Sequence, residues 1–386
     1  MAPLINFLLA GLASLPAVLA RDIVVTPGDD IQAAVDSASP GDVILLREGT
    51  YRPSENIQIR TKGSSSSPYT LRNYQDENVV IDGDNLPGTP APLGGSLAGS
   101  DRGVLHLEDA EYWRIIGLTV TKGPYGVYVR NSHNNYFERL TTHHNYETGF
   151  HMQNSVSNNE IVYLDTYRNA DPRNNGQNSD GIAIKEGSGK GNIIRGIRSY
   201  ENADDGIDLY EFTDAVTILD NIVFDNGINR WDFSPYRGDG LGIKLGGGST
   251  SNRAPVNHVA RNNFSFRNRR GFSDNNMPGD MTLEHNTAWK NREQGFNQRS
   301  STATYRNNLA ANNMDTSALD RQNDLRGGVT GSGNNWEDGG SFTDSDFIAS
   351  STSLIKGSRQ ADGKIVPSDF LRPRDGGDYG ATTHWA

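Results

Sequence analysis

The chain has 386 residues, of which 34% are hydrophobic, and its 47 acidic residues outnumber its 36 lysines and arginines for a formal net charge of −11. This acidic balance argues against nucleic acid as a partner, and the absence of cysteine excludes disulfide bonds. A modest apolar content together with 43 glycines indicates many short strands and tight turns around a narrow core, so we expect one elongated repeat domain.

The first twenty residues predict a signal peptide. They carry no charged side chain, and they end in Val18-Leu19-Ala20, where small residues suit cleavage before Arg21. The apolar run is too short, and too interrupted by Pro and Gly, to span a membrane. We therefore expect a signal peptide over residues 1–20, a secreted, extracellular mature protein over 21–386, and no membrane partner.

A short amphipathic helix is predicted after the first apolar run of the mature chain. Asp29 or Asp30 can cap its N-terminus, and Ile31, Ala34 and Val35 fall on one helical face. A stacked core needs a cover at its open end. We expect this helix to be that N-terminal cap.

From about Tyr112 the chain repeats a glycine followed by an apolar residue, at positions 126, 149, 181, 206, 242, 271 and 295. The shortest common spacings are 23 to 25 residues, and insertions at 170–179 and 228–238 account for the two longest ones. This period, with short alternating strands and no helix between them, predicts a parallel β-helix, an all-β fold whose coils occupy about residues 112–313. Residues 314–386 lose the period, and we expect them to pack along the outside or to close the C-terminal end.

Each repeat unit closes on an asparagine at the same phase. In a stack of coils these side chains can form an internal ladder, in which each amide bonds to the next and satisfies buried turn backbone. The predicted ladder contains Asn145, Asn169, Asn202, Asn226, Asn268 and Asn291. One sequon, Asn263-Phe264-Ser265, is a candidate for N-glycosylation in a eukaryotic host.

Ionisable residues gather in the centre of the repeat, just before a marking glycine, two positions after one, or, for Asp204, next to such a residue. They are Asp180, Asp204, Asp205, Asp208 and Lys244. Residues of the same phase form a column in a parallel stack, so we expect these five side chains to converge in one patch. Four carboxylates this close need a compensating charge. Ca²⁺, which accepts hard oxygen ligands in irregular geometry, is the cofactor that we expect.

Two catalytic interpretations remain open on these residues alone. In β-elimination on a uronic acid polymer, a free amine at Lys244 would take the C5 proton while the cation stabilises charge on the substrate carboxylate; an alkaline pH optimum would follow. In glycoside hydrolysis, Asp205 would pair with Asp180 or Asp208, which leaves the lysine without a role. A β-helical carbohydrate-binding protein that keeps the calcium site for structure is a third, non-catalytic alternative.

Three stretches carry a family resemblance: Asn178-Ser-Asp180-Gly-Ile-Ala-Ile-Lys185, Asn202-Ala-Asp204-Asp205-Gly-Ile-Asp208-Leu-Tyr and Gly238-Asp-Gly-Leu-Gly-Ile-Lys244. In order and spacing they resemble the central coils of polysaccharide lyase family nine, the pectate lyases and related pectin-backbone lyases. The resemblance implies a right-handed parallel β-helix, a calcium ion held by the four aspartates, and Lys244 as the base. We therefore expect a secreted, monomeric, calcium-dependent pectate lyase that acts on the acidic polysaccharide polygalacturonate, with a rhamnogalacturonan or other uronan lyase as the alternative.

Four further residues are candidates for substrate contact. Trp231 lies in the second insertion, where it could stack on a sugar ring or anchor the loop. Lys185 and Arg237 are candidate partners for substrate carboxylates in the cleft. His151, on a coil before the acidic cluster, is either a subsite residue or a polar surface position.

Overall fold

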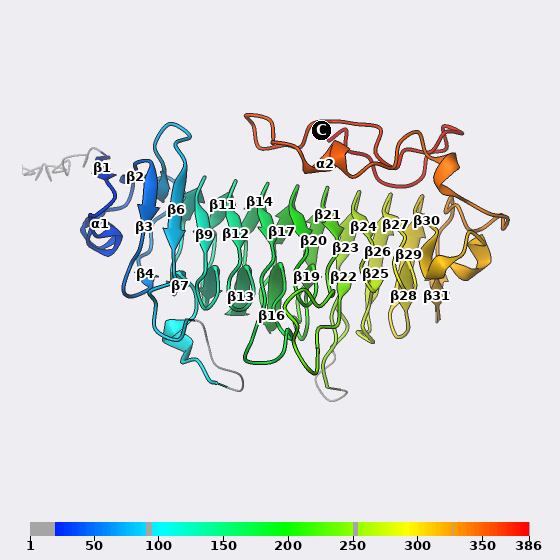
Figure 1. Ribbon diagram of the computed structural model, residues 1–386, viewed down its shortest axis with the longest axis horizontal. Helices are drawn as coiled ribbons and strands as arrows, with labels where there is room; N and C mark the ends of the chain where they lie inside the picture. The colour runs from blue at the N-terminus through cyan, green and yellow to red at the C-terminus, as the bar shows by residue number, and fades with distance from the viewer. Residues whose placement is uncertain (1–19, 90–94, 250–253, 327, 386) are drawn as a thin grey trace, which may run out of the picture.

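The computed structural model describes residues 20–89, 95–249, 254–326 and 328–385. Apart from Ala20, the predicted signal peptide lies outside the described residues. The described chain winds into a single stack of coils, with the three strands of a coil entering three different sheets (Figure 1). Every pairing between its named strands within these sheets is parallel, so the prediction of an all-β parallel β-helix is confirmed.

The sheets are numbered here in the order in which a coil visits them. In the part of the chain that the structure describes, sheet 1 has 12 strands: β1 (Asp22–Val25), β2 (Val43–Leu46), β5 (Tyr69–Asn73), β8 (Trp113–Ile116), β11 (Tyr136–Glu138), β14 (Glu160–Val162), β17 (Asn192–Arg195), β20 (Val216–Leu219), β23 (Val259–Arg261), β26 (Asp280–Glu284), β29 (Thr302–Arg306) and β32 (Val329–Thr330).

Sheets 2 and 3 have 10 strands each among the described residues. Sheet 2 contains β3 (Gly49–Tyr51), β6 (Val79–Asp82), β9 (Thr119–Thr121), β12 (Thr141–His143), β15 (Asp165–Tyr167), β18 (Arg198–Tyr200), β21 (Ile222–Phe224), β24 (Phe264–Phe266), β27 (Thr287–Trp289) and β30 (Leu309–Ala311). Sheet 3 contains β4 (Ile57–Ile59), β7 (Leu105–Glu108), β10 (Val127–Arg130), β13 (Phe150–Ser155), β16 (Ile182–Ser188), β19 (Ile207–Asp208), β22 (Leu241–Lys244), β25 (Arg270–Ser273), β28 (Phe296–Gln298) and β31 (Asp324–Leu325).

The core is a column of stacked apolar side chains inside the coils. Alternate residues of a strand point to opposite faces of its sheet, so in β11 Phe137 points inward and is buried while Tyr136 and Glu138 stay partly exposed. The strand register places Phe137 opposite Ile115 on one side and Ile161 on the other. Burying each such side chain contributes about 1.5–3 kcal/mol.

The predicted asparagine ladder is confirmed. The Nδ2 of Asn145 donates to the Oδ1 of Asn169 at 2.9 Å, and Asn169 donates likewise to Asn202 at 2.9 Å. Asn202 donates to Asn226 and Asn226 to Asn268, both at 3.0 Å. At the next step it is the backbone N–H of Asn268 that donates to the Oδ1 of Asn291, at 3.0 Å. Beyond the prediction it runs on from Asn291 to Asn313 and Gln322.

Two further asparagine columns were not predicted. One begins at Asn135 and Asn159, and the other contains Asn221, Asn263, Asn286, Asn308 and Asn334. The sequon residue Asn263 is fully buried in the second of these columns, where it accepts from Asn221 at 2.8 Å and donates to Asn286 at 2.9 Å. Its amide is therefore not available for glycosylation in the folded protein.

The ends of the stack are covered differently. At the N-terminal end, helix α1 (Ile31–Ser37) buries Ile31, Ala34 and Val35, and the Asp30 side chain accepts from the N–H of Gln32 at 2.8 Å, as an N-cap does. The strand ladders also reach beyond the predicted coils, to β1 in one direction and β32 in the other. These outer coils lack the repeated glycine and asparagine marks, so periodicity alone could not find them.

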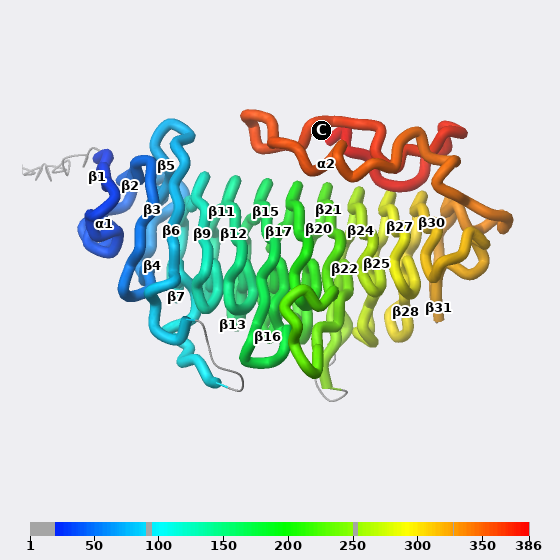
Figure 2. Tube along the Cα trace, viewed as in Figure 1, coloured from blue at the N-terminus to red at the C-terminus, as the bar shows by residue number. Residues whose placement is uncertain are grey.

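The C-terminal segment returns along the outside of the stack (Figures 1 and 2). Its only α-helix among the described residues is α2 (Ser353–Lys356), and 3-10 turns lie at η2 (Asn313–Asp315), η3 (Leu319–Arg321) and η4 (Asp344–Asp346), with η1 (Gly99–Asp101) near the N-terminal end. It packs on the outer face of sheet 2, where Phe224, Phe266 and Trp289 form a second buried cluster with Phe347 and Phe370. No helix of the described chain has the length and apolar character that crossing a bilayer requires.

Candidate active site

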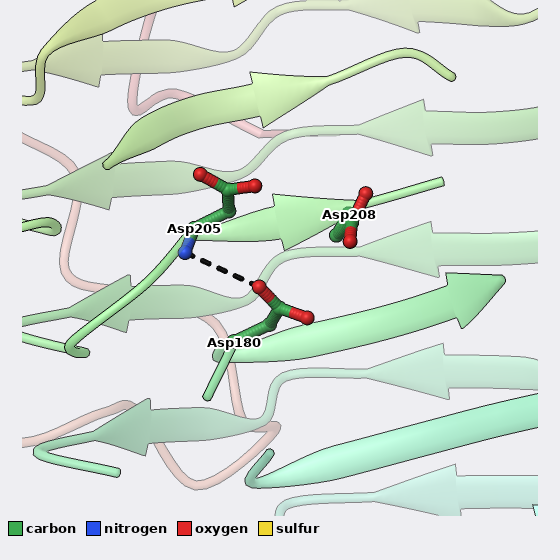
Figure 3. Close-up of side chains that lie close together, drawn as sticks. All are labelled: Asp180, Asp205 and Asp208. Carbon is green, nitrogen blue, oxygen red and sulfur yellow. Dashed lines mark hydrogen bonds between the residues drawn. The ribbon is translucent and has the colours of Figure 1, made fainter. Parts of the chain in front are cut away.

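The candidate site lies on sheet 3, where three consecutive coils contribute to one patch. Strand β19 pairs with β22 so that Asp208 stands opposite Lys244, and β16 pairs with β19 on the other side. Asp180 and Asp205 directly precede the glycines that enter β16 and β19, and the Asp205 N–H donates to Asp180 Oδ1 at 3.2 Å (Figure 3). Parallel stacking thus brings together residues that lie up to 64 positions apart, from 180 to 244.

Two overlapping carboxylate groups form the patch. The buried Asp180, Asp205 and Asp208 each offer an oxygen within 4.8 Å of the others. Asp204, Asp205 and Asp239 form a second such group, so Asp205 belongs to both. The backbone N–H of Leu241 holds this shared carboxylate in place by donating to Asp205 Oδ1 at 2.6 Å.

Two buried lysines face these carboxylates. The Nζ of Lys244 lies 3.0 Å from Asp205 Oδ2 and 3.6 Å from Asp208 Oδ1. The Nζ of Lys185 lies 2.8 Å from Asp180 Oδ2 and 3.2 Å from Asp208 Oδ2. Lys185 is therefore part of the acidic cluster itself.

The electrostatics of the cluster favour additional positive charge. Burial, followed by the repulsion of Asp205, raises the pKa of Asp204 to about 8. Burial likewise raises the pKa of Asp205 to about 8, an effect that Lys244 opposes and Asp180 and Asp208 reinforce. Ionising several carboxyl groups with such pKa values together costs considerable free energy unless a cation is bound beside them.

The donor set fits a calcium ion. All the candidate ligand atoms are carboxylate oxygens, which hard cations prefer. Ca²⁺ takes about six to eight oxygen ligands in flexible geometry, whereas Mg²⁺ demands near-ideal octahedral geometry and usually keeps several waters. A crowded set of carboxylates on three coils therefore suits Ca²⁺ better.

Comparison with known proteins shows to which family the chain belongs. The family model for the Pel9A-like right-handed β-helix region matches residues 17–323. The chain belongs to this family. The predicted resemblance and the right-handed coil are thereby confirmed.

Relatives of this Pel9A-like chain include pectate lyase PEL9 of Emericella nidulans. The two sequences are 48% identical over 406 residues, an alignment that covers 97% of each chain. Pectate lyase L of Dickeya chrysanthemi is 34% identical over 355 residues, covering 88% of this chain and 77% of the relative. The crystal structure of pectate lyase Pel9A superposes with a TM-score of 0.75 at 29% identity, covering 92% of this chain and 90% of that one. A rhamnogalacturonan lyase structure, at 20% identity and a TM-score of 0.76, shares the fold.

Within the Pel9A-like fold, three predicted substrate residues lie outside the acidic cluster. Arg237 is exposed, and its N–H donates to the Asn175 carbonyl at 3.0 Å, which ties the two insertions together. Trp231 stacks on Phe233 over the turns that follow sheet 2. His151, on β13, is only 3% exposed; it stacks on Tyr128, and neither ring nitrogen has a hydrogen-bond partner.

One member of the Pel9A-like patch was missed by sequence reasoning. Asp239 lies 3.7 Å from Lys244 Nζ, and its N–H donates to Asp204 Oδ1 at 2.5 Å. A signal existed, because Asp239-Gly240 repeats the Asp-Gly pair of the two preceding coils. Gly240 of this pair lies two residues before the marking Gly242, so an alignment on the marking glycines did not place Asp239 with the other aspartates.

Proposed function

We infer that this chain is a pectate lyase, which cleaves polygalacturonate by β-elimination. Family membership and the pectate lyases among its relatives support the activity. The observation that carries the site assignment is the buried Lys244 amine, 3.0 Å from Asp205 in a patch of carboxylates built by three successive coils. A hydrolase would leave this lysine without a function.

Lys244 is the proposed general base. Its amine takes the proton from C5 of the uronate at the cleavage site; the C5–H electrons form a C4–C5 double bond as the C4–O4 bond breaks. The O4 oxygen leaves with the neighbouring sugar and is protonated, so no water is consumed. Asp205 and Asp208 hold the amine in one place through their contacts at 3.0 and 3.6 Å, which orients it toward substrate.

Ca²⁺ is the proposed cofactor, held by Asp180, Asp204, Asp205 and Asp208. When bound it would attract the substrate carboxylate and stabilise the negative charge that develops there as the C5 proton is removed. Asp239 joins the proposed ligands through its shared group with Asp204 and Asp205. An acidic protein can recruit an acidic polymer only through such a cation or through local basic side chains.

We also propose that the protein is secreted and acts as a monomer on pectate outside the cell. The apolar, uncharged stretch at residues 1–20 supports export.

The experiment is an absorbance assay for the unsaturated uronide, with polygalacturonate at alkaline pH, in calcium and again in chelator. The wild-type rate should require calcium. Lys244→Met, which keeps the length of the side chain, should lose about 10²–10⁴-fold of that rate because the base is gone. The matched control is Lys190→Met, which replaces an exposed lysine near the same sheet.

Calcium binding by titration calorimetry provides a readout independent of turnover. Lys244→Met should still bind calcium, whereas Asp205→Asn should bind it far more weakly. Full activity in Lys244→Met would remove the lysine from the mechanism. New reducing ends without ultraviolet absorbance would instead identify hydrolysis.

A further inference from the structure

A second hollow lies on the turns that follow the strands of sheet 2, apart from the acidic cluster. Its volume is about 670 Å³, and none of the cluster carboxylates lines it. Its floor comes from the turns after β9, β12 and β15, three neighbouring coils. Adjacent strands are about 4.8 Å apart, so the floor extends roughly 10 Å along the stack.

An ordered aromatic loop forms the wall of the hollow. Trp231 and Phe233 reach it from the loop after β21, and their rings stack with centroids 6.1 Å apart at 16°. Asn229 closes this loop, because its side chain accepts from the Phe233 N–H at 3.1 Å and donates to the Phe233 carbonyl at 2.9 Å. Trp231 is thus presented, partly exposed, on a closed loop.

The loop also packs tightly on the first insertion. A Cβ at Gly176 would lie 3.2 Å from Phe233 and 2.9 Å from Tyr236, so the two insertions meet at a position that only glycine suits. The backbone of Gly176, with φ of +93°, is likewise one that glycine adopts readily. This contact holds the aromatic wall over the floor.

The cations of the hollow are already paired. Lys122 lies 3.4 Å from Asp82 and 3.6 Å from Asp84, and Arg168 lies 2.7 Å from Glu201. A free carboxylate entering the hollow would therefore compete with existing ion pairs.

The histidines of the hollow are neutral near neutral pH. Burial, together with the nearby His144, lowers the pKa of His143 to about 4, and burial also lowers the pKa of His144. Their Nδ1 atoms lie 2.7 Å apart, and the His143 ring stacks on Tyr167. Besides its two paired cations, the lining thus offers apolar ring faces and neutral polar groups, which suit a ligand with an apolar face and hydroxyls.

We propose that this hollow binds uncharged sugar residues of a polysaccharide, with Trp231 stacking on the apolar face of a pyranose ring. It is a binding site separate from the cluster that takes the uronate carboxylate, and it does not depend on the lyase reaction. Neutral side-chain sugars and methyl-esterified uronate share the required chemistry. The site would hold the enzyme on polymer that the cluster cannot yet cleave.

The test is affinity electrophoresis of the full chain in gels that contain neutral galactan, highly methyl-esterified pectin or polygalacturonate. Every protein carries Lys244→Met to limit cleavage, and the galactan arm contains no uronate, so its result stands whether or not the lyase mechanism holds. Trp231→Ala is compared with Trp231→Phe and with Tyr74→Ala, which removes a partly exposed aromatic ring elsewhere on the stack. Thermal unfolding of each variant reports folding.

Trp231→Ala should bind the uncharged polymers about tenfold more weakly, since it loses one aromatic contact of about 1.4 kcal/mol. Trp231→Phe should retain most of the binding, and Tyr74→Ala should match the parent. Retardation by galactan alone would identify neutral sugars, and retardation by esterified pectin alone would identify the esterified backbone. The proposal is overturned if neither uncharged polymer retards the protein, or if Trp231→Ala migrates like the parent.

Discussion

Lys244 shows how strongly the chemistry of one side chain depends on its neighbours. Burial lowers the pKa of its amine, but the attraction of Asp205 and Asp208 outweighs burial and raises the pKa well above its ordinary value. A cation shared by those carboxylates would cancel much of their attraction. Burial would then favour the neutral amine, which is the form that can accept a proton.

This balance predicts an alkaline activity profile. The neutral fraction of the amine grows as the pH rises through its pKa, so with saturating calcium the initial rate should increase from neutral into alkaline pH. The measurement is a pH–rate profile for release of unsaturated uronide at constant ionic strength. A maximum at acidic pH would contradict the assignment of a lysine as the base.

At the scale of the element, the asparagine ladder is the feature that holds one coil on the next. Asn226 accepts from the N–H and the side-chain amide of Asn202, both at 3.0 Å, and donates to Asn268 at 3.0 Å. All three asparagines are buried. Each rung therefore satisfies polar groups that no water can reach.

Removing one rung should destabilise the stack. Asn226→Ala removes the acceptor of the Asn202 N–H and one of the two acceptors of its side-chain amide, which keeps only the Ser199 hydroxyl at 3.2 Å. Leaving the buried N–H unsatisfied should cost about 1–3 kcal/mol. The thermal unfolding midpoint should fall by several degrees, measured by calorimetry. Asn78→Ala, at an exposed turn, is the matched control, and equal midpoints for the two variants would show that the ladder is not needed for stability.

The elements show which parts of the fold could be predicted. The glycine and asparagine marks were enough to align Asp208 with Lys244, because strands in a parallel stack keep a constant register. The same alignment missed Asp239, whose Asp-Gly pair is out of phase in a loop. It also missed the first coils, where strands such as the wholly apolar β2 carry no glycine or asparagine mark.

At the scale of the whole molecule, the C-terminal segment acts as a second layer on sheet 2. Phe370 is buried there, with its ring 5.5 Å from Phe264 and 5.4 Å from Phe266. Its sequence has no period, so its path could not be predicted beyond a general expectation of packing. The apolar outer face of sheet 2, which only the folded stack creates, determines where it lies.

This layer should contribute to stability in a measurable way. Phe370→Ala removes a buried aromatic ring and should lower the free energy of unfolding by about 3–5 kcal/mol. Val366→Ala in the same segment, where Val366 is 54% exposed, should change it by less than about 0.5 kcal/mol. Thermal unfolding of both variants provides the test. An equal loss of stability in the two variants would show that the buried face of this segment does not stabilise the fold.

The parallel register also has a consequence for the order of assembly. Each coil pairs with the coil before it, about 24 residues earlier in the regular repeat, as the coil of Asn169 pairs with that of Asn145. Because synthesis proceeds from the N-terminus, the chain can therefore add one coil at a time onto a finished surface, in the manner of a solenoid. We expect the carboxylates and Lys244 to be in place once β22 has docked, well before the last residues are synthesised. The proposed catalytic site would then form before the C-terminal segment packs on sheet 2.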